Sequence, residues 1–335
     1  MAKTILGVDI GYNSLKLALC KDGIVRKAVA VDMPQNLVRE GQFTSPEAMG
    51  TLIKESMKQN GIRASRAALV MPGESAFVRL VTMPRMTVEQ LEINLPYEFR
   101  DYITDELKNY VFDYAMISTP EEMEQEPENE DEPPSMELMA AAVRSSALEE
   151  AKSIFRRAGL RLVKAAPTLC AYISLVRNTR RAHQGTEFCM LDLGFGAVRM
   201  RMFRGDRYIA TRELDAGLSA VVEAISNEKD VDAHLAHTYF TSNFENCQNE
   251  DYCINIYNNI SVELRRALNF YHFSNPGSEL TDVLVCGAGA VIPPLQAAIA
   301  ETLDMELHQA SEQIPGGDRV ENCHSFVEAI GITMD

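Results

Sequence analysis

Two short stretches, Val8-Asp9-Ile10-Gly11-Tyr12 and Leu191-Asp192-Leu193-Gly194-Phe195, decide the fold of this chain. They coincide when the sequence is laid on itself at an offset of 183 residues, the separation of Val8 from Leu191. The match continues without gaps, because Leu15-Lys16-Leu17 falls on Val198-Arg199-Met200. Each copy has the pattern of an apolar strand, a turn at glycine and a second strand. The repetition predicts a duplicated domain whose halves each begin with a β-hairpin.

The turn of each hairpin has the chemistry of a phosphate site. A glycine directly after a strand lets consecutive backbone N–H groups point at one spot, which forms an anion-binding nest. Asp9 and Asp192, one from each copy, are expected to face each other across a cleft between two lobes, where carboxylates suit a hydrated Mg²⁺. In the first copy Asn13, Ser14 and Lys16 add polar groups beside the turn. Two unrelated hairpins that share Asp-x-Gly by coincidence are the alternative.

A third glycine turn lies near the C-terminus. Val283-Leu284-Val285 predicts a buried strand, Gly287-Ala288-Gly289 a turn of close backbone approach, and Pro293 the start of a helix. Upstream, Glu263 and Arg266 lie one turn apart in a helical pattern. A nucleotide contact is one interpretation of both features. The alternatives are a turn common to many α/β proteins and an ordinary surface ion pair.

Length and charge limit the class of protein. The chain has 335 residues, more than one hydrophobic core usually supports, so two lobes are expected. The formal net charge is −16, and the stretch Glu121–Glu132 holds eight acids and no base. This balance argues against a nucleic-acid partner, which would need a basic patch, and it disfavours direct docking on anionic lipid.

The remaining composition predicts a cytoplasmic protein with no direct membrane insertion. No stretch approaches the roughly 18 continuous apolar residues that span a bilayer, and the N-terminus lacks the apolar core of a signal peptide. The seven cysteines are scattered and mostly lie in apolar runs, which predicts buried, reduced thiols. His234 and His237 lie one helical turn apart, but no third ligand follows at a convincing metal-binding spacing.

Taken in order, these motifs resemble those of the actin, DnaK-chaperone and sugar-kinase superfamily. Asp9-Ile10-Gly11-Tyr12-Asn13-Ser14 resembles its first phosphate motif, and Asp192-Leu193-Gly194 resembles its second. Cys286-Gly287-Ala288-Gly289-Ala290 resembles its adenosine motif, and Phe326-Val327-Glu328-Ala329-Ile330-Gly331 its second connecting helix.

More narrowly, the chain is similar to the PilM family of cytoplasmic actin-like components of type IV pilus and related secretion systems, which is akin to the cell-division protein FtsA. The segments that carry this narrower match are residues 71–75, 83–87, 139–143 and 263–268. The resemblance implies an α/β protein with an actin-like (ribonuclease H-like) duplicated two-lobe fold and an inserted small α+β subdomain. The expected limits are 1–76 with 163–180 for the first lobe, 77–162 for the inserted subdomain and 181–335 for the second lobe.

The resemblance also implies ATP and Mg²⁺ as cofactors in the central cleft. By motif, the phosphates would meet Gly11, Asn13, Ser14 and Lys16 in the first turn and Gly194 in the second. Asp9 and Asp192 would hold the Mg²⁺ through water. Glu263 and Arg266 would meet the ribose and base, and Gly287 and Gly289 the adenosine.

Two departures from the superfamily pattern argue against fast catalysis. The second turn, Phe195-Gly196-Ala197, lacks the small hydroxyl residues that the family places there. Ala166 stands where active relatives commonly have a carboxylate that orients water. Loss of one positioning group commonly lowers the rate about 10²–10⁴-fold, so we expect at most a slow ATPase and name no catalytic residue.

The inserted subdomain carries an apolar stripe at helical spacing that includes Leu91, Leu95 and Phe99, interrupted by Pro96. A strand that alternates in character, including Val78-Arg79-Leu80, precedes it. Together these six residues are the candidate partner-binding groove, with core packing of the stripe as the alternative. The acidic run 119–135 predicts a mobile hairpin loop, because it offers too little apolar surface to become ordered.

The expected partner is a short N-terminal peptide of a single-span inner-membrane pilus protein similar to PilN. The chain would then be cytoplasmic and peripheral to the inner face of the plasma membrane through that partner, as a scaffold. Its C-terminal residues, Gly331 to Asp335, show no basic amphipathic tail of the kind that FtsA-like proteins use. Oligomers are possible. A small-molecule kinase of the same fold and an FtsA-like cell-division protein are the alternatives.

Overall fold

The computed structural model describes residues 3–11, 13–34, 37–39, 42–71, 73–117, 134–179 and 185–334. The chain forms two compact units, the first comprising Met1–Leu175 with Glu328–Asp335 and the second Val176–Val327. The finer domain limits expected from the sequence stay a prediction. Most of the acidic run 119–135, expected to be a mobile loop, lies outside the described residues.

The first unit is built on a five-stranded sheet in the order β10-β6-β1-β2-β3. Its strands are β1 (Thr4–Ile10), β2 (Ser14–Lys21), β3 (Ile24–Asp32), β6 (Arg66–Met71) and β10 (Arg161–Pro167). β1, β6 and β10 run parallel, while β1, β2 and β3 form an antiparallel meander. A separate short ribbon pairs β4 (Val38–Arg39) with β5 (Gln42–Phe43).

Helices cover both faces of this sheet. α1 (Pro46–Gln59) and α4 (Ser145–Arg157) bury their apolar sides in one core with β1 and β2. On the other face, Ala171 of α5 (Thr168–Arg177) and Ile332, just beyond α10 (Val327–Gly331), pack on β1 and β6. A Cβ at Gly7 would lie 1.6 Å from the Ala329 carbonyl oxygen, so only glycine lets β1 approach α10 this closely.

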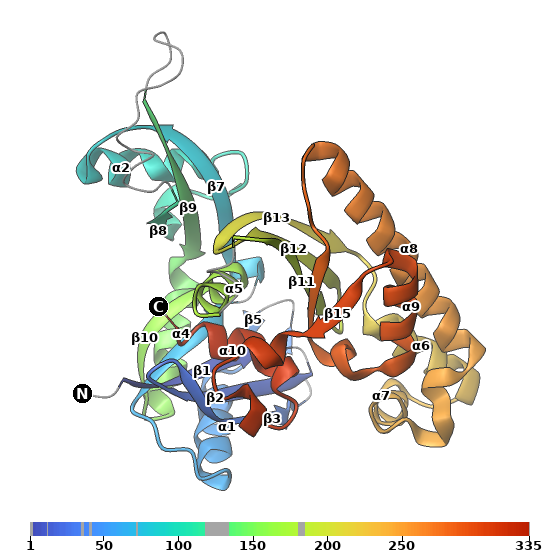
Figure 1. Ribbon diagram of the computed structural model, residues 1–335. Coiled ribbons are helices and arrows are strands. Elements are labelled where there is room, and N and C mark those ends of the chain that lie inside the picture. The colour runs from blue at the N-terminus through green and yellow to red at the C-terminus, as the bar shows by residue number, and fades with distance from the viewer. Residues whose placement is uncertain are drawn as a thin grey trace. The chain divides into compact units, whose positions relative to one another are not determined.

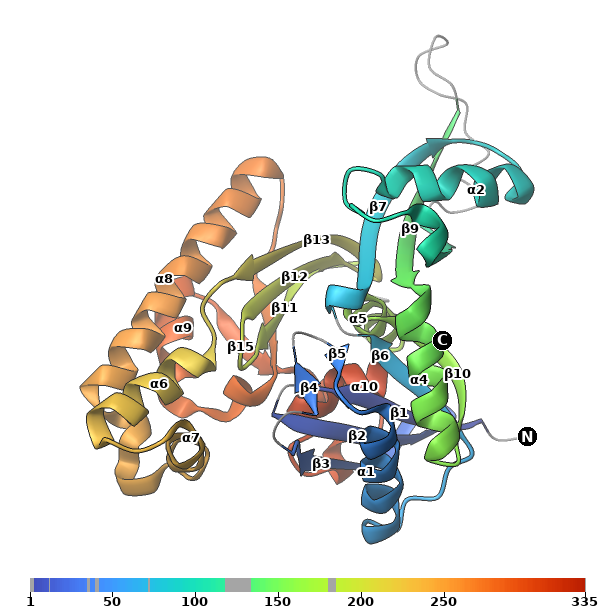
Figure 2. The ribbon, with the colours of Figure 1, turned by 180° about the vertical axis from the view of Figure 1, so that it is seen from behind.

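A three-stranded antiparallel sheet in the order β7-β9-β8 projects from the first unit (Figures 1 and 2). Its strands are β7 (Ala76–Pro84), β8 (Tyr110–Met116) and β9 (Ser135–Arg144). α2 (Val88–Asn94) begins at a capping box made by Thr87 and Gln90. A 3₁₀ helix, η2 (Leu95–Phe99), follows at once, so the interruption predicted at Pro96 is confirmed.

The second unit repeats the plan of the first sheet, in the order β13-β12-β11-β14-β15. Its strands are β11 (Glu187–Leu193), β12 (Val198–Arg204), β13 (Arg207–Leu214), β14 (Asp282–Cys286) and β15 (Glu306–Gln309). Again three strands form a meander, and two parallel neighbours extend the sheet on the β11 side. The predicted duplication of an α/β unit that begins with a hairpin is therefore confirmed.

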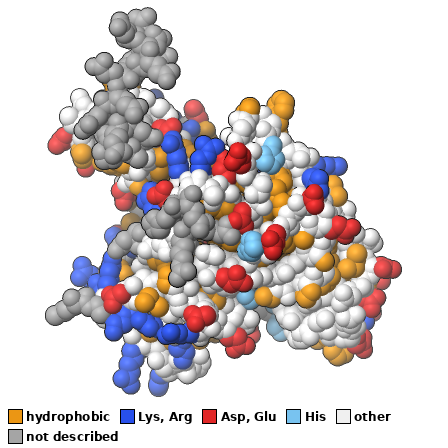
Figure 3. Space-filling model, viewed as in Figure 1, with side chains coloured by type: hydrophobic (Ala, Val, Ile, Leu, Met, Phe, Trp, Pro, Cys, Tyr) orange, Lys and Arg blue, Asp and Glu red, His pale blue; other side chains and the backbone are white. Residues whose placement is uncertain are grey.

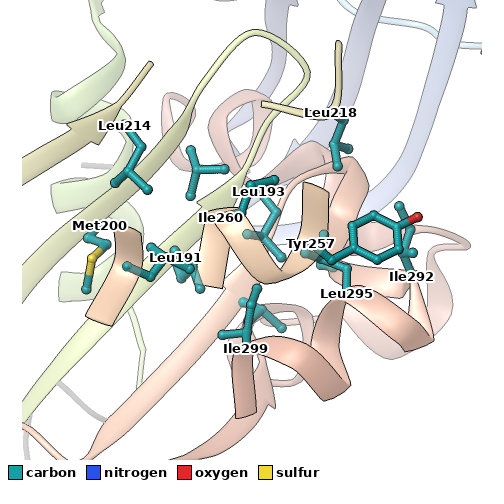
Figure 4. Close-up of a cluster of buried hydrophobic side chains, with 14 of the residues drawn as sticks. Leu191, Leu193, Met200, Leu214, Leu218, Tyr257, Ile260, Ile292, Leu295 and Ile299 are labelled. Atoms are coloured by element: carbon teal, nitrogen blue, oxygen red, sulfur yellow. The ribbon is translucent and has the colours of Figure 1, made fainter. Parts of the chain in front are cut away.

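Four helices accompany this second sheet. They are α6 (Leu218–Lys229), α7 (Ala233–Ser242), α8 (Asp251–Ser274) and α9 (Pro293–Leu303). Figure 4 shows Leu191 and Leu193 of β11 packed against Tyr257 and Ile260 of α8 and the apolar side of α9. This core fixes β11, and with it Asp192, in place.

The structure bears out the expectation of buried, reduced thiols. All seven cysteines are free thiols, and six of them are buried. Burial raises the pKa of the Cys20 and Cys170 thiols to about 11, so these thiols stay protonated and unreactive at neutral pH. No helix among the described residues is long and apolar enough to cross a membrane.

Candidate functional site

The first hairpin brings an acid and a cation together beside its turn. Antiparallel pairing places Asp9 of β1 directly opposite Lys16 of β2. The Lys16 Nζ lies 3.1 Å from Asp9 Oδ2, and the two side chains are 26% and 10% exposed. The backbone N–H of Gly11 donates to the Ser14 carbonyl at 3.0 Å and closes the turn. Lys16 is thus anchored by Asp9 but still partly open to solvent.

The predicted polar residues of this turn lie where the sequence placed them. Asn13 and Ser14 are partly exposed, and the Asn13 carbonyl accepts a hydrogen bond from the Met33 N–H at 3.0 Å. The structure therefore brings Asp9, Gly11, Asn13, Ser14 and Lys16 together at one end of the sheet. A cation, a hydroxyl and an amide in one turn form a donor set suited to phosphate oxygens.

The second hairpin holds its acid differently. Asp192 stands opposite Arg199, but Arg199 bonds instead to Glu213 of β13, with Nε at 2.8 Å and Nη2 at 3.1 Å from the carboxylate oxygens. Arg201, two residues along β12, places its Nη1 3.4 Å from Asp192 Oδ2. The side chains of this second pair are 4% and 8% exposed, so the guanidinium is fixed inside the protein.

The turn of the second hairpin is tied to the start of α6. The carbonyl of Gly194 accepts from the Leu218 N–H at 3.1 Å, and that of Phe195 accepts from the Ser219 N–H at 2.8 Å. A Cβ at Gly217 would lie 2.4 Å from the Phe195 carbonyl oxygen. This turn therefore packs against a helix start, which accounts for glycine at 217.

The glycine turn after β14 lies directly on the second hairpin. Gly287 has φ +85°, and a Cβ there would lie 2.7 Å from Asp192 Oδ1 and 2.8 Å from the Leu193 carbonyl oxygen. A Cβ at Gly289 would lie 2.7 Å from the Leu193 Cβ. The structure thus brings Asp192, Gly194, Gly287 and Gly289 together, although they are far apart in the sequence. Backbone approach of this kind is what glycine supplies at a ligand site.

Glu263 and Arg266 form an exposed ion pair on α8, with Arg266 Nη1 2.5 Å from Glu263 Oε1. The structure shows the surface pair that was the alternative, and a role for these residues at ribose or base stays a prediction. Near this face of α8, the Arg212 guanidinium lies 4.8 Å from the Phe270 ring centroid.

The six candidate partner-binding residues divide into two groups. Leu91, Leu95 and Phe99 are buried in the core beneath the three-stranded sheet, as the core-packing alternative has it, and expose no surface to a peptide. Val78, Arg79 and Leu80 lie on β7, which pairs among the described strands only with β9. Val78 and Arg79 are half-buried and Leu80 is exposed. A peptide site in this subdomain would therefore rest on the β7 edge.

Comparison with known proteins decides the family. A family model described as type IV pilus assembly protein PilM matches residues 7–322. This chain belongs to the PilM family. No curated protein sequence matches it.

Solved structures agree on the fold. The similar chain in a PilM–PilN type IV pilus biogenesis complex has 22% identity and a TM-score of 0.81, over 98% of this chain and 97% of its own. The ethanolamine utilization protein EutJ from Carboxydothermus hydrogenoformans has 13% identity and a TM-score of 0.60, over 99% and 89%. MreB5 of Spiroplasma citri, solved with bound ADP, has 10% identity and a TM-score of 0.51, over 98% and 94%. The fold is therefore actin-like, as predicted.

The donor set of this PilM-family chain fits a nucleotide better than a bare metal. No group of three or more His, Cys, Asp or Glu side chains within the described ranges could hold a metal ion, so His234 and His237 form no such site there. Asp9 and Asp192 each lie beside a basic side chain. A hydrated Mg²⁺ needs only one or two carboxylates when phosphate oxygens complete its shell. Asp192 Oδ1 lies in the close contact between Gly287 and the second hairpin, whereas Asp9 Oδ2 lies beside the partly exposed Lys16.

Two residues of this PilM-family chain, Arg201 and Tyr97, were not singled out from the sequence. Arg201 was overlooked because the offset of 183 matches Lys16 with Arg199. Only the strand register shows that Arg199 pairs with Glu213 and not with Asp192. Tyr97 and Tyr102 are exposed, with Arg100 over the first ring at 4.7 Å and Arg79 of β7 over the second at 3.8 Å. Helical spacing put Tyr102 on the apolar stripe, but the chain changes to a 3₁₀ helix at Leu95–Phe99 and Tyr102 is exposed.

Proposed function

We propose that this chain is an ATP-binding adaptor on the cytoplasmic face of a type IV pilus inner-membrane platform, where it binds a PilN-like single-span protein. The observation that carries the proposal is the match of the PilM family model to residues 7–322. It favours the pilus over the small-molecule kinase and the cell-division alternatives. The likeness to the chain of a PilM–PilN complex supports the choice of partner.

The nucleotide would use the residues that the hairpins gather. Lys16, Asn13 and Ser14 would meet phosphate in the first unit, since Lys16 is held in place by Asp9 and still reaches solvent. Gly287 and Gly289 would let adenosine approach the backbone in the second unit, near Gly194. Bound Mg²⁺, held through water by Asp9, would offset the negative charge of the phosphates. MreB5 with bound ADP supports nucleotide binding on this fold.

The chain has few groups with which to hydrolyse ATP. Ala166 pairs in register with Val70 near the end of β10 and offers no carboxylate to orient water. Phe195 and Ala197 flank the second turn without a hydroxyl group. We therefore expect turnover below about 1 s⁻¹, the low end of ordinary enzymes, which suits an adaptor that responds to bound nucleotide.

The partner's N-terminal peptide would pair with the outer edge of β7. A strand that has a neighbour on one side only presents free N–H and C=O groups to an extended peptide. Leu80 is exposed on that strand, and Tyr102, which contacts Arg79 of the same strand, adds exposed aromatic surface. The Arg79 guanidinium lies 3.8 Å from the Tyr102 ring centroid and donates to the Glu98 carbonyl. An apolar peptide suits this aromatic and aliphatic border.

Calorimetry with a synthetic peptide tests this proposal. The peptide would comprise the N-terminal cytoplasmic residues of a PilN-like single-span protein from the same organism. Binding in the micromolar range is expected for the wild type. Leu80→Asp should weaken it at least tenfold, while Val262→Asp, which changes an equally exposed residue on α8, should leave it unchanged. Equal affinity of both variants would exclude β7, and absence of binding by the folded wild type would overturn the adaptor function.

A further inference from the structure

Six exposed cations of the first unit gather along one edge of its five-stranded sheet, in a protein whose formal net charge is −16. We call this set the basic edge, and its members are Lys21, Arg26, Lys58, Arg63, Arg156 and Arg161. Figure 3 shows Lys and Arg side chains collected on this part of the first unit. The overall acidity of the chain therefore hides a local surface of the opposite sign.

The topology of the sheet places these residues together. β6 and β10 run parallel and begin side by side, with Arg161 opposite Arg66. β2 ends at Lys21, opposite Thr4 at the start of β1. α1 and α4 end at the same edge, because each leads into one of the parallel strands. Lys27 donates from Nζ to the Asn60 carbonyl, which joins the start of β3 to the end of α1.

Little negative charge balances the basic edge. None of its six members forms an ion pair with any residue that the structure describes. Asp22, which follows Lys21 on the β2–β3 turn, accepts from the Lys3 backbone N–H at 2.7 Å. Cations at helix C-termini are ordinary, which accounts for Lys58 and Arg156. It does not account for the four members on strands and loops.

The shape of the basic edge suits a broad anionic surface. Its members come from six segments along the width of a five-stranded sheet, which spans about 20 Å at the usual strand spacing. No aromatic side chain is among them, whereas sites for single-stranded nucleic acid interleave cations with aromatic rings. The β7-β9-β8 sheet lies at the other end of the unit (Figures 1 and 2). Charges more than about 8 Å away are largely screened at physiological salt. The sign of the charge on the docking surface itself therefore matters more than the net charge of the chain.

We propose that the basic edge docks on the anionic phospholipid headgroups of the cytoplasmic membrane leaflet. This inference rests on the proposed function, which puts the protein beside that membrane, and it revises the expectation that the net charge forbids lipid docking. Each Lys or Arg near an anionic leaflet strengthens binding about fivefold. Three or four cations within reach give a weak, reversible contact. Combined with the peptide of a membrane-anchored partner, that contact raises the overall affinity through effective concentration.

Vesicle cosedimentation of the full chain, without partner, tests the proposal. The vesicles contain phosphatidylcholine alone or with phosphatidylglycerol as the anionic lipid. The variant Lys58→Gln/Arg63→Gln/Arg156→Gln removes three cations of the basic edge. The matched control, Lys108→Gln/Arg265→Gln/Arg319→Gln, removes three exposed cations elsewhere and gives the same net charge. Circular dichroism verifies that both variants fold.

The wild type and the control are expected to sediment with phosphatidylglycerol vesicles at low salt, and not with vesicles of phosphatidylcholine alone. Both should dissociate from the vesicles in about 0.5 M NaCl, because salt at that concentration screens most of the electrostatic attraction. The edge variant should bind about 100-fold more weakly. Equal loss in both variants, or no preference of the wild type for phosphatidylglycerol, would overturn the proposal. Tighter binding to duplex DNA or to a second copy of the chain would also overturn the proposal, because the basic edge would then bind that partner and not lipid. The peptide calorimetry is independent of these outcomes, so failure of either proposal is recognised separately.

Discussion

The two hairpins of this chain share a register but hold their acids in different ways. Asp9 is paired with the residue directly opposite, Lys16, and that cation is partly exposed. Asp192 is paired with Arg201, two residues beyond its opposite neighbour, and that cation is buried. The first pair can be rearranged by a ligand from solvent, whereas the second is part of the core. Of the two copies of the motif, the first thus has a cation that a ligand can reach, and the second has a cation that stabilises the core.

The cause of the difference lies one strand away. Lys16 faces Ala30 on β3, so Asp9 is the only acid in its cross-strand row. Arg199 faces Glu213 on β13 and forms a bidentate pair with it, which leaves Asp192 to Arg201. Cross-strand neighbours decide such choices because their side chains lie on the same face about 5 Å apart.

The largest effect expected from this comparison is on stability. Arg201→Met removes the cation that pairs with buried Asp192, while Arg199 stays bonded to Glu213, and breaking a buried pair on one side costs about 3 kcal/mol or more. Lys16→Met should cost about 1 kcal/mol or less, because solvent reaches that pair. Amide hydrogen exchange on β11 and β1 would report the two units separately. Adding Asp192→Asn should recover much of the loss, and equal effects of the two single variants would contradict the comparison.

Glycine substitution sharpens the same contrast. Gly287→Ala forces a Cβ into contact with Asp192 Oδ1 and the Leu193 carbonyl oxygen at a positive φ, at an expected cost of about 2 kcal/mol. Gly11→Ala brings its Cβ no nearer than 3.2 Å to the Ser14 carbonyl oxygen and should cost less than about 1 kcal/mol. Thermal unfolding of both variants measures this. A larger loss for Gly11→Ala would show that the first turn is the more constrained one.

The ends of the hairpins away from the turns differ as well, and the difference should appear in the pH dependence of stability. Glu187, opposite Arg204, corresponds to Thr4, opposite Lys21, at the same offset. Burial alone would raise the pKa of the Glu187 carboxyl. Ser278, Arg204 and the Glu279 N–H, however, hold that pKa below its ordinary value of 4.5. The stabilisation is therefore complete above about pH 4.5 and is lost as the pH falls through the lower folded-state pKa.

Glu187→Gln should accordingly lower the stability of the second unit by about 1 kcal/mol at pH 7 and remove part of its acid sensitivity. Protection of β11 amides, corrected for the intrinsic exchange rate at each pH, is the measurement. β1 serves as the internal reference, because Thr4 does not titrate. Unchanged acid sensitivity of β11 in the variant would assign the effect to other carboxyl groups.

The sequence predicted the backbone of this fold well, because the hairpin repeat depends on local signals. The apolar strand, the glycine turn and the offset of 183 all lie within single segments, and so does the break at Pro96. It did not predict which cation pairs with Asp192, since that depends on Glu213, a strand away. It also put Leu91 and Phe99 at a groove, because helical spacing reports an apolar face without saying what covers it.

Calorimetry with a non-hydrolysable ATP analogue and Mg²⁺ tests the central claim, that the exposed cation of the first hairpin binds the phosphates. The wild type should bind one equivalent, with phosphate release from ATP below about 1 s⁻¹. Lys16→Met should weaken binding at least tenfold, because its cation is open to phosphate. Lys21→Met, the matched change at the other end of β2, should not. Absence of binding by the wild type, or equal affinity of the two variants, would contradict the account.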